Sequence, residues 1–260
     1  MRPRTVKATR YVTPLREGGS LPAVVEADDD GLYVLKFRGA GQGPKALIAE
    51  LVAGELARSL GLPVPEIVFV EVDAELARTE PDPEIQDLIR ASAGLNLALD
   101  YLPGSVTFDP AAETVEAGLA SSVVWFDAFT TNVDRTARNT NMLMWHRQLY
   151  LIDHGAALYF HHNWDNYLAR SRTAFPQVRD HVLLPWASAL GGADERLSAL
   201  LTEGLIREVL GFVPDLWLAA ESRFASAAEH REAYAAYLLS RLSPPRDFAK
   251  EAADARALSV

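Results

Sequence analysis

Two acidic residues and an asparagine in residues 132–155 could together hold a metal ion and activate a hydroxyl group. Asn139 stands five residues after Asp134, and Asp153 follows two short apolar runs and precedes a His-Gly pair. Carboxylate and amide oxygens are ligands that Mg²⁺ prefers, and a carboxylate can accept the proton of an attacking hydroxyl. Transfer of a phosphoryl group needs this combination. A polar turn whose Asn and Asp side chains cap the backbone would have the same composition.

Two charged residues nearer the N-terminus favour the chemical interpretation. Lys36 lies in the apolar run YVLKF, and strand alternation places it on one face with Val34 and Arg38. Glu50 lies in an apolar helical run, where Glu55 is a competitor. A strand lysine oriented by a helix glutamate is the device that holds nucleotide phosphates in phosphoryl-transfer enzymes. Taken singly, each residue is also typical of a solvated surface, but the five polar residues in this order are a much stronger signal.

The elements that must position these residues follow the order strands, helix, strands, then mostly helices. Predicted strands cover residues 22–27, 31–37, 66–72, 95–102, 141–145 and 149–153, and predicted helices cover 44–60, 84–94, 112–130 and much of the chain beyond 183. This order predicts an α+β fold of two lobes. The smaller lobe, residues 1–100, is an antiparallel β lobe with one helix, and the larger lobe, residues 101–260, is mostly helical. We expect a ligand in the cleft between them.

Composition excludes several classes of protein. The 260 residues include no cysteine, which rules out disulfides and thiolate metal sites, and the net charge is −10. A chain this acidic is not expected to bind nucleic acid, whose phosphates require a basic surface. Neither a membrane-spanning apolar run nor a secretory signal is apparent, so we expect a cytoplasmic protein with no membrane partner.

Four segments of the chain resemble the HipA-like branch of the protein-kinase-like superfamily. They are GLYVLKF (31–37), AELVAGELARSLGLPVPE (49–66), NVDRTARNTNML (132–143) and LYLIDHG (149–155). The resemblance covers roughly residues 15–160. The rest of the chain resembles the family only in being mostly helical. It implies a bilobal protein-kinase-like fold.

The resemblance also implies a role for each of the five polar residues. Lys36 would contact the α- and β-phosphates of ATP, and Glu50 would pair with it. Asp134 would be the catalytic base, while Asn139 and Asp153 would bind Mg²⁺, with Asp153 as the principal ligand. Asn141 lies directly before the MLM strand. It would be the Mg²⁺ ligand instead of Asn139 if the loop carries two residues more than the kinase pattern.

Other parts of the nucleotide site depart from the kinase pattern or are defined by position only. No G-x-G-x-x-G run is present, and EGGS (17–20) is the one glycine-containing hairpin in the corresponding place. The residue two before the predicted base is Asn132 where many kinases have His. The resemblance puts the following residues at the nucleotide: Gly18, Gly19 and Ser20 at the phosphates, and the main chain of Ala98, Leu99 and Asp100 at the adenine edge.

The sequence therefore predicts an ATP- and Mg²⁺-dependent, HipA-like kinase. Its acceptor would be a protein Ser/Thr or the hydroxyl of a small molecule. Two alternatives stay open. One is a pseudokinase that binds nucleotide as a scaffold, and the other is an enzyme that transfers AMP on the same fold.

Overall fold

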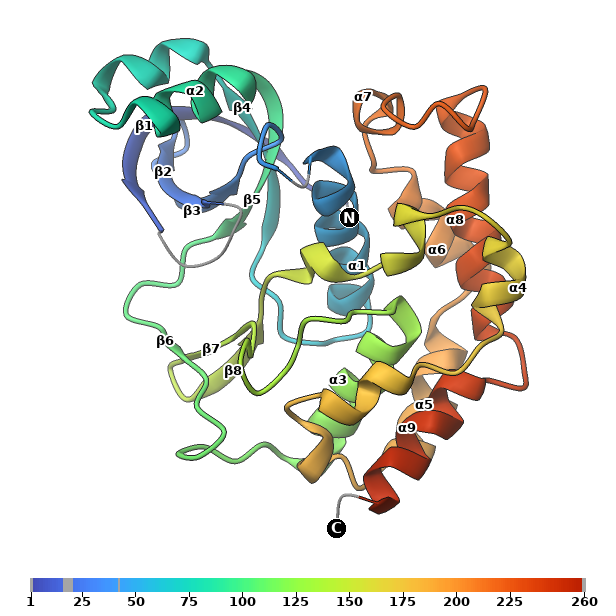
Figure 1. The fold of residues 1–260 in the computed structure, drawn as a ribbon. Helices are drawn as coiled ribbons and strands as arrows, with labels where there is room; N and C mark the ends of the chain where they lie inside the picture. Colours follow the sequence, from blue (N-terminus) through green and yellow to red (C-terminus); the bar gives the residue numbers. More distant parts are fainter. Residues whose placement is uncertain (1, 16–20, 42, 259–260) are drawn as a thin grey trace.

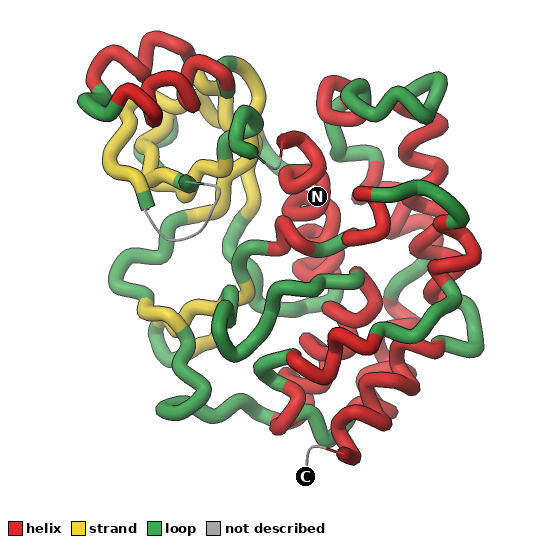
Figure 2. Tube along the Cα trace, in the orientation of Figure 1, coloured by secondary structure: helices red, strands yellow, loops and turns green. Residues whose placement is uncertain are grey.

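The chain folds into a β barrel, a small three-stranded sheet and a helical region. The computed structural model describes residues 2–15, 21–41 and 43–258. Figures 1 and 2 show the strands gathered on one side of the molecule and most helices on the other. Gly18, Gly19 and Ser20, predicted to meet the phosphates, lie outside the described residues. Among the described residues, no helix combines the length and apolar character that crossing a membrane requires.

Five strands form the barrel in the order β1-β2-β3-β5-β4. They are β1 (Thr5–Pro14), β2 (Ala23–Ala27), β3 (Leu32–Lys36), β4 (Ile67–Val72) and β5 (Gly94–Asp100). The barrel closes because β1 runs parallel to β4, with Thr5 beside Phe69. The expectation of a wholly antiparallel lobe is therefore wrong at this pair. A parallel partner needs a long connection, which β2, β3 and the following helix provide, and closure removes the unpaired edges of the sheet.

The barrel interior is one of two hydrophobic cores. In β3, Tyr33 and Leu35 are buried in this core, whereas Val34 and Lys36 face outward. The core is covered by helix α2 (Pro83–Ala91) and by the 3₁₀ helix η1 (Ala74–Thr79), which lie across one end of the barrel in Figure 1. Strand alternation thus directs Lys36 out of the barrel, as the sequence predicts.

Helix α1 (Gly43–Ser59) belongs to the second core, and every residue from Leu47 to Ala57 is buried. It stands between the barrel and the C-terminal helices (Figure 1). Gly54 lets the helix approach β4, because a Cβ atom there would overlap the side chain of Ile67. The short helix predicted over residues 84–94 is α2, so this part of the chain contains a second α-helix that the outline of a lobe with one helix left out.

The remaining elements form a small sheet and the helical region. The sheet has the order β6-β7-β8, made of β6 (Val106–Thr107), β7 (Met142–Trp145) and β8 (Gln148–Leu151). The α-helices are α3 (Ala117–Thr130), α4 (Tyr167–Ser171), α5 (Leu190–Leu200), α6 (Glu203–Leu210), α7 (Asp215–Leu218), α8 (Ala227–Leu242) and α9 (Asp247–Leu258). Helix α3 begins five residues later than predicted, since the Glu116 side chain caps it by accepting from the N–H groups of Gly118 and Leu119.

Candidate active site

Lys36, Glu50 and Asp153 come from three separate elements and meet in one cluster. The Nζ atom of Lys36, at the end of β3, donates to Glu50 Oε2 at 2.5 Å and to Asp153 Oδ1 at 2.6 Å. Glu50 lies within α1 and its side chain is fully buried, whereas the side chain of Asp153, just beyond β8, is 45% exposed. The cluster therefore has a closed end at Glu50 and an open end at Asp153.

Electrostatics keeps this cluster ionised despite its burial. Burial alone would raise the pKa of Glu50, but the ammonium group of Lys36 outweighs it and lowers that pKa to about 2. Burial likewise acts to lower the pKa of Lys36, yet the carboxylates of Glu50 and Asp153 raise it above its usual value. At neutral pH the site thus contains the ionised pair of Lys36 and Glu50, with the carboxyl group of Asp153 bonded to the same ammonium group.

Asp134 lies in the loop between α3 and β7, and both candidate asparagines contact it. Asn139 Nδ2 donates to Asp134 Oδ2 at 2.7 Å, and Asn141 Nδ2 lies 3.2 Å from the main-chain oxygen of Asp134 and 3.4 Å from its Oδ2. Asn139 is exposed, but Asn141 is buried. The carbonyl oxygen of Asn141 also accepts from the N–H of Ile152 at 3.0 Å, which brings the loop beside Asp153.

The main chain predicted to meet the adenine edge is already bonded within the barrel. Ala98 and Leu99 lie in the middle of β5 and pair with β3 on one side and with β4 on the other. The N–H of Asp100 donates to the carbonyl of Glu66 at 2.8 Å, and the N–H of Tyr101 donates to that of Leu32 at 2.9 Å. The chain leaves the sheet only after these residues.

The sequence matches a family model described as "HipA-like kinase" over residues 9–249. The chain belongs to the HipA-like kinase family. It is therefore a kinase, an enzyme that transfers phosphoryl groups.

One solved kinase structure resembles this chain in fold. The crystal structure of the Helicobacter pylori proinflammatory kinase CtkA matches with a TM-score of 0.56 and 14% identity, over 98% of this chain and 99% of that one. Two structures of the Golgi casein kinase, one with Mn/ADP bound, match with TM-scores of 0.44 and 0.45 and identities of 13% and 14%, over 95% of this chain and 75% of theirs. No curated protein sequence matches the chain.

Two groups of buried residues around the cluster of this HipA-like kinase were not predicted from the sequence to belong to the site. His154 is fully buried, and its Nδ1 lies 3.5 Å from the second carboxylate oxygen of Glu50. Beneath the loop, Arg135 and Asp127 form an ion pair with Nε 2.6 Å from Oδ2, and both side chains are almost inaccessible to solvent. The position of His154 directly after Asp153 was a usable signal, but nothing in the spacing of Asp127 and Arg135 marks them as partners.

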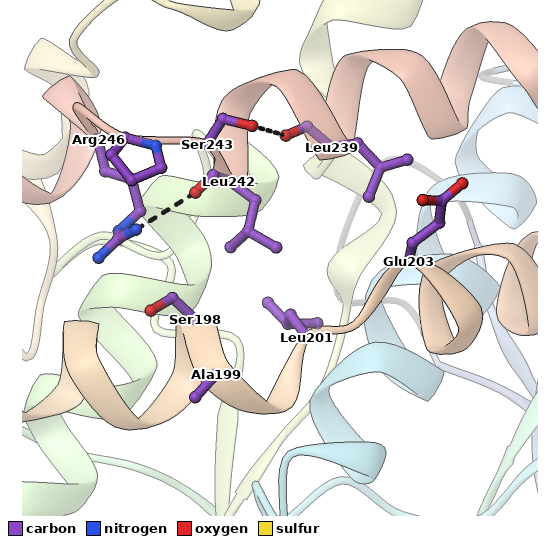
Figure 3. A pocket seen from close by; sticks show the side chains of 9 residues that line it. Ser198, Ala199, Leu201, Glu203, Leu239, Leu242, Ser243 and Arg246 are labelled. Carbon is purple, nitrogen blue, oxygen red and sulfur yellow. Dashed lines mark hydrogen bonds between the residues drawn. The ribbon is translucent and has the colours of Figure 1, made fainter.

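Two hollows in the surface of the described residues lie away from this cluster. Figure 3 shows one of about 450 Å³ between α5, α6 and α8, and another of about 380 Å³ adjoins it. In the first, Ser243 Oγ donates to the carbonyl of Leu239 at 2.9 Å, and Arg246 lies within 3.4 Å of that of Leu242. The guanidinium group of Arg246 is also paired with Asp194 through two hydrogen bonds of 2.7 Å. These polar groups are thus bonded within the protein rather than directed together at a substrate. The candidate active site is accordingly defined by its polar cluster.

Proposed function

We propose that this kinase binds Mg·ATP between its β barrel, within residues 1–100, and its helical part, within residues 101–260. It transfers the γ-phosphoryl group to the hydroxyl of a protein Ser/Thr or of a small molecule. One observation carries the proposal: Lys36 lies between the carboxylates of Glu50 and Asp153, at 2.5 and 2.6 Å. This meeting of residues separated by up to 117 positions in the chain supports the proposal, because phosphoryl transfer uses a lysine that is oriented by a glutamate and lies beside a metal-binding aspartate.

Lys36 would bind the α- and β-phosphates through its ammonium group. Glu50 holds that group from the buried side, and its low pKa keeps the carboxylate charged through the neutral range. A fixed ammonium group loses less freedom on binding phosphate than a mobile one, so Glu50 prepares Lys36 for its ligand.

The oxygen donors at the open end of the cluster fit a magnesium ion. Asp153 is partly exposed, and an asparagine amide that donates through its nitrogen leaves its oxygen for a metal. We assign this ligand to Asn141 in preference to Asn139, because the main chain of Asn141 is bonded to Ile152, the residue before Asp153. When bound, Mg²⁺ would neutralise charge on the phosphate oxygens.

Asp134 would accept the proton of the acceptor hydroxyl. The amide groups of Asn139 and Asn141 both lie within hydrogen-bonding distance of its Oδ2. They orient the carboxylate and leave its other oxygen, Oδ1, for the hydroxyl. The adenine edge would meet the main chain just where it leaves strand β5, at the carbonyl of Tyr101 and the N–H of Leu102, because the N–H of Tyr101 is bonded to Leu32.

The Asp153→Ala variant tests this proposal. We expect it to lose Mg·ATP-dependent turnover while its unfolding transition stays that of a folded protein. Full activity in the variant would contradict the metal assignment. A wild-type protein that binds nucleotide but consumes no ATP with any of a broad panel of acceptors would favour a pseudokinase. The mass added to the protein in a self-reaction distinguishes phosphoryl transfer from AMP transfer.

A further inference from the structure

Arg135, the residue after Asp134, connects three parts of the candidate site through one buried guanidinium group. Its side chain has no accessible surface. The Nε atom donates to Asp127, and one terminal nitrogen donates to the carbonyl of Asn141 and lies 3.4 Å from the carbonyl of Ile152. The loop that carries Asp134, the start of β7 and the residue before Asp153 therefore share one hydrogen-bonding group.

Asp127 anchors this guanidinium to helix α3. Its Oδ2 accepts from Arg135 Nε at 2.6 Å and lies 3.0 Å from His181 Nε2, and its Oδ1 accepts from Asn132 Nδ2 at 3.1 Å. Burial alone would raise the pKa of Asp127, but the charge of Arg135 and the bond to His181 lower it below its usual value. Because His181 Nδ1 accepts from the N–H of Leu183 at 3.0 Å, its other ring nitrogen, Nε2, is the one that donates to Asp127.

The carbonyls that Arg135 holds belong to strained parts of the backbone. Asn141 has φ of +48°, and Asp153, which follows Ile152, has φ of +54°. Side chains of the L configuration rarely adopt this region, and such residues persist when their surroundings fix them. A guanidinium group is a rigid planar fork with several donors, so it can fix two carbonyls and a carboxylate at once, which a lysine cannot.

We propose that Arg135, anchored by Asp127, is a positioning residue. It sets the separation between Asp134, which activates the acceptor, and the metal-binding side chains of Asn141 and Asp153. This inference rests on the function proposed above. Arg135 itself touches neither nucleotide nor acceptor, and acts through the backbone of the residues that do.

The Arg135→Lys variant tests this role, with Arg241→Lys as a matched control. Arg241 is equally buried, and it donates to main-chain carbonyls of α3 and of residues 171 and 173 without contacting the Asp134 loop. The probe is calorimetric titration with Mn²⁺ and a non-hydrolysable ATP analogue. Loss of an outer partner of a metal ligand typically costs 10- to 100-fold in metal affinity or activity. We expect a dissociation constant about 10- to 100-fold higher for Arg135→Lys and an unchanged one for Arg241→Lys.

The dissociation constant separates positioning from stability, because a smaller folded fraction lowers the binding stoichiometry and leaves the constant of the folded molecules intact. Equal constants in the two variants would refute the role of Arg135. If Arg135→Lys does not fold, His181→Gln weakens the anchor on Asp127 and should shift the constant in the same direction by a smaller factor. An unshifted constant in that folded variant would also count against the proposal.

A different variant tests the proposed function independently of the role of Arg135. Asp153→Asn should abolish the Mn²⁺-dependent part of nucleotide binding, whatever Arg135 does. If Asp153→Asn binds the probe like the wild type, the metal assignment is wrong. If it loses binding while Arg135→Lys keeps it, only the positioning role is wrong.

Discussion

Replacing Glu50 by Gln should destabilise the folded chain by about 3 kcal/mol at neutral pH. The ion pair to Lys36 lowers the pKa of Glu50 from 4.5 to about 2. At about 1.4 kcal/mol per pH unit, that difference corresponds to about 3 kcal/mol. The figure needs no discount for solvent screening because the Glu50 side chain is fully buried, and breaking a buried ion pair typically costs about 3–5 kcal/mol.

Glu55→Gln is the matched control on the same helix. Glu55 pairs with Arg58 three residues away at 2.7 Å, and the side chain of Arg58 is 35% exposed. The Glu55 side chain is itself only 6% exposed, but its partner Arg58 is partly open to water, so we expect a contribution nearer to the roughly 0–1 kcal/mol of a surface pair. Urea unfolding of the two variants at pH 7 therefore compares the loss of a fully buried ion pair with the loss of a half-buried one. Equal losses of stability in both variants would refute the reasoning.

The pH dependence provides a second check on Glu50. A carboxyl group whose pKa is lower in the folded than in the unfolded chain stabilises the fold above its unfolded pKa, here 4.5. That contribution disappears as the pH falls toward the folded value of about 2. The stability gap between the wild type and Glu50→Gln should thus be constant near pH 7 and shrink below about pH 5. A gap that stays constant down to the acid unfolding of the wild type would contradict the assigned pKa shift.

Two further changes probe the asparagine assignment and the packing of α1. Asn141→Ala should raise the Mg²⁺ concentration required for half-maximal activity by about 10- to 100-fold, whereas Asn139→Ala should lower turnover at saturating Mg²⁺. If magnesium titrations show the reverse pattern, Asn139 is the metal ligand. Gly54→Ala should cost about 1–3 kcal/mol in urea unfolding, because the added methyl group overlaps Ile67, and an unchanged midpoint would contradict the close approach of α1 to β4.

Local sequence pattern predicted most of the elements that position the site. The strand around Lys36, the helix that carries Glu50 and the β7–β8 hairpin before Asp153 lie within a few residues of their predicted positions. Apolar alternation, helical spacing and glycine or proline stops act within a few residues, so they are visible in the chain itself. The parallel pairing of β1 with β4 was missed because it depends on closure of the whole barrel.

The buried polar network was beyond local pattern for the same reason. Asp127 and Arg135 are eight residues apart, and His181 lies 54 residues beyond Asp127. Sequence alone does not say that the turn after α3 folds Arg135 back onto that helix. It also left Glu50 and Glu55 as competitors, although only Glu50 reaches Lys36. Which polar groups share a buried site is decided by tertiary contacts, whereas which segments form strands is decided largely by local residues.

The packing of α1 within the second core, against outward-facing barrel residues and the helical region, favours a lasting Lys36–Glu50 pair. Helix α1 buries large apolar side chains against the barrel and the helical region at once, namely Leu47, Ile48, Leu51, Val52 and Leu56. Each fully buried side chain of this size is worth roughly 1.5–3 kcal/mol, so pulling α1 out of place would cost on the order of 10 kcal/mol. That is comparable to the whole stability of a typical domain. The packing of α1 therefore favours a conformation in which Glu50 lies beside Lys36, and a displaced α1 would be a costly minor state.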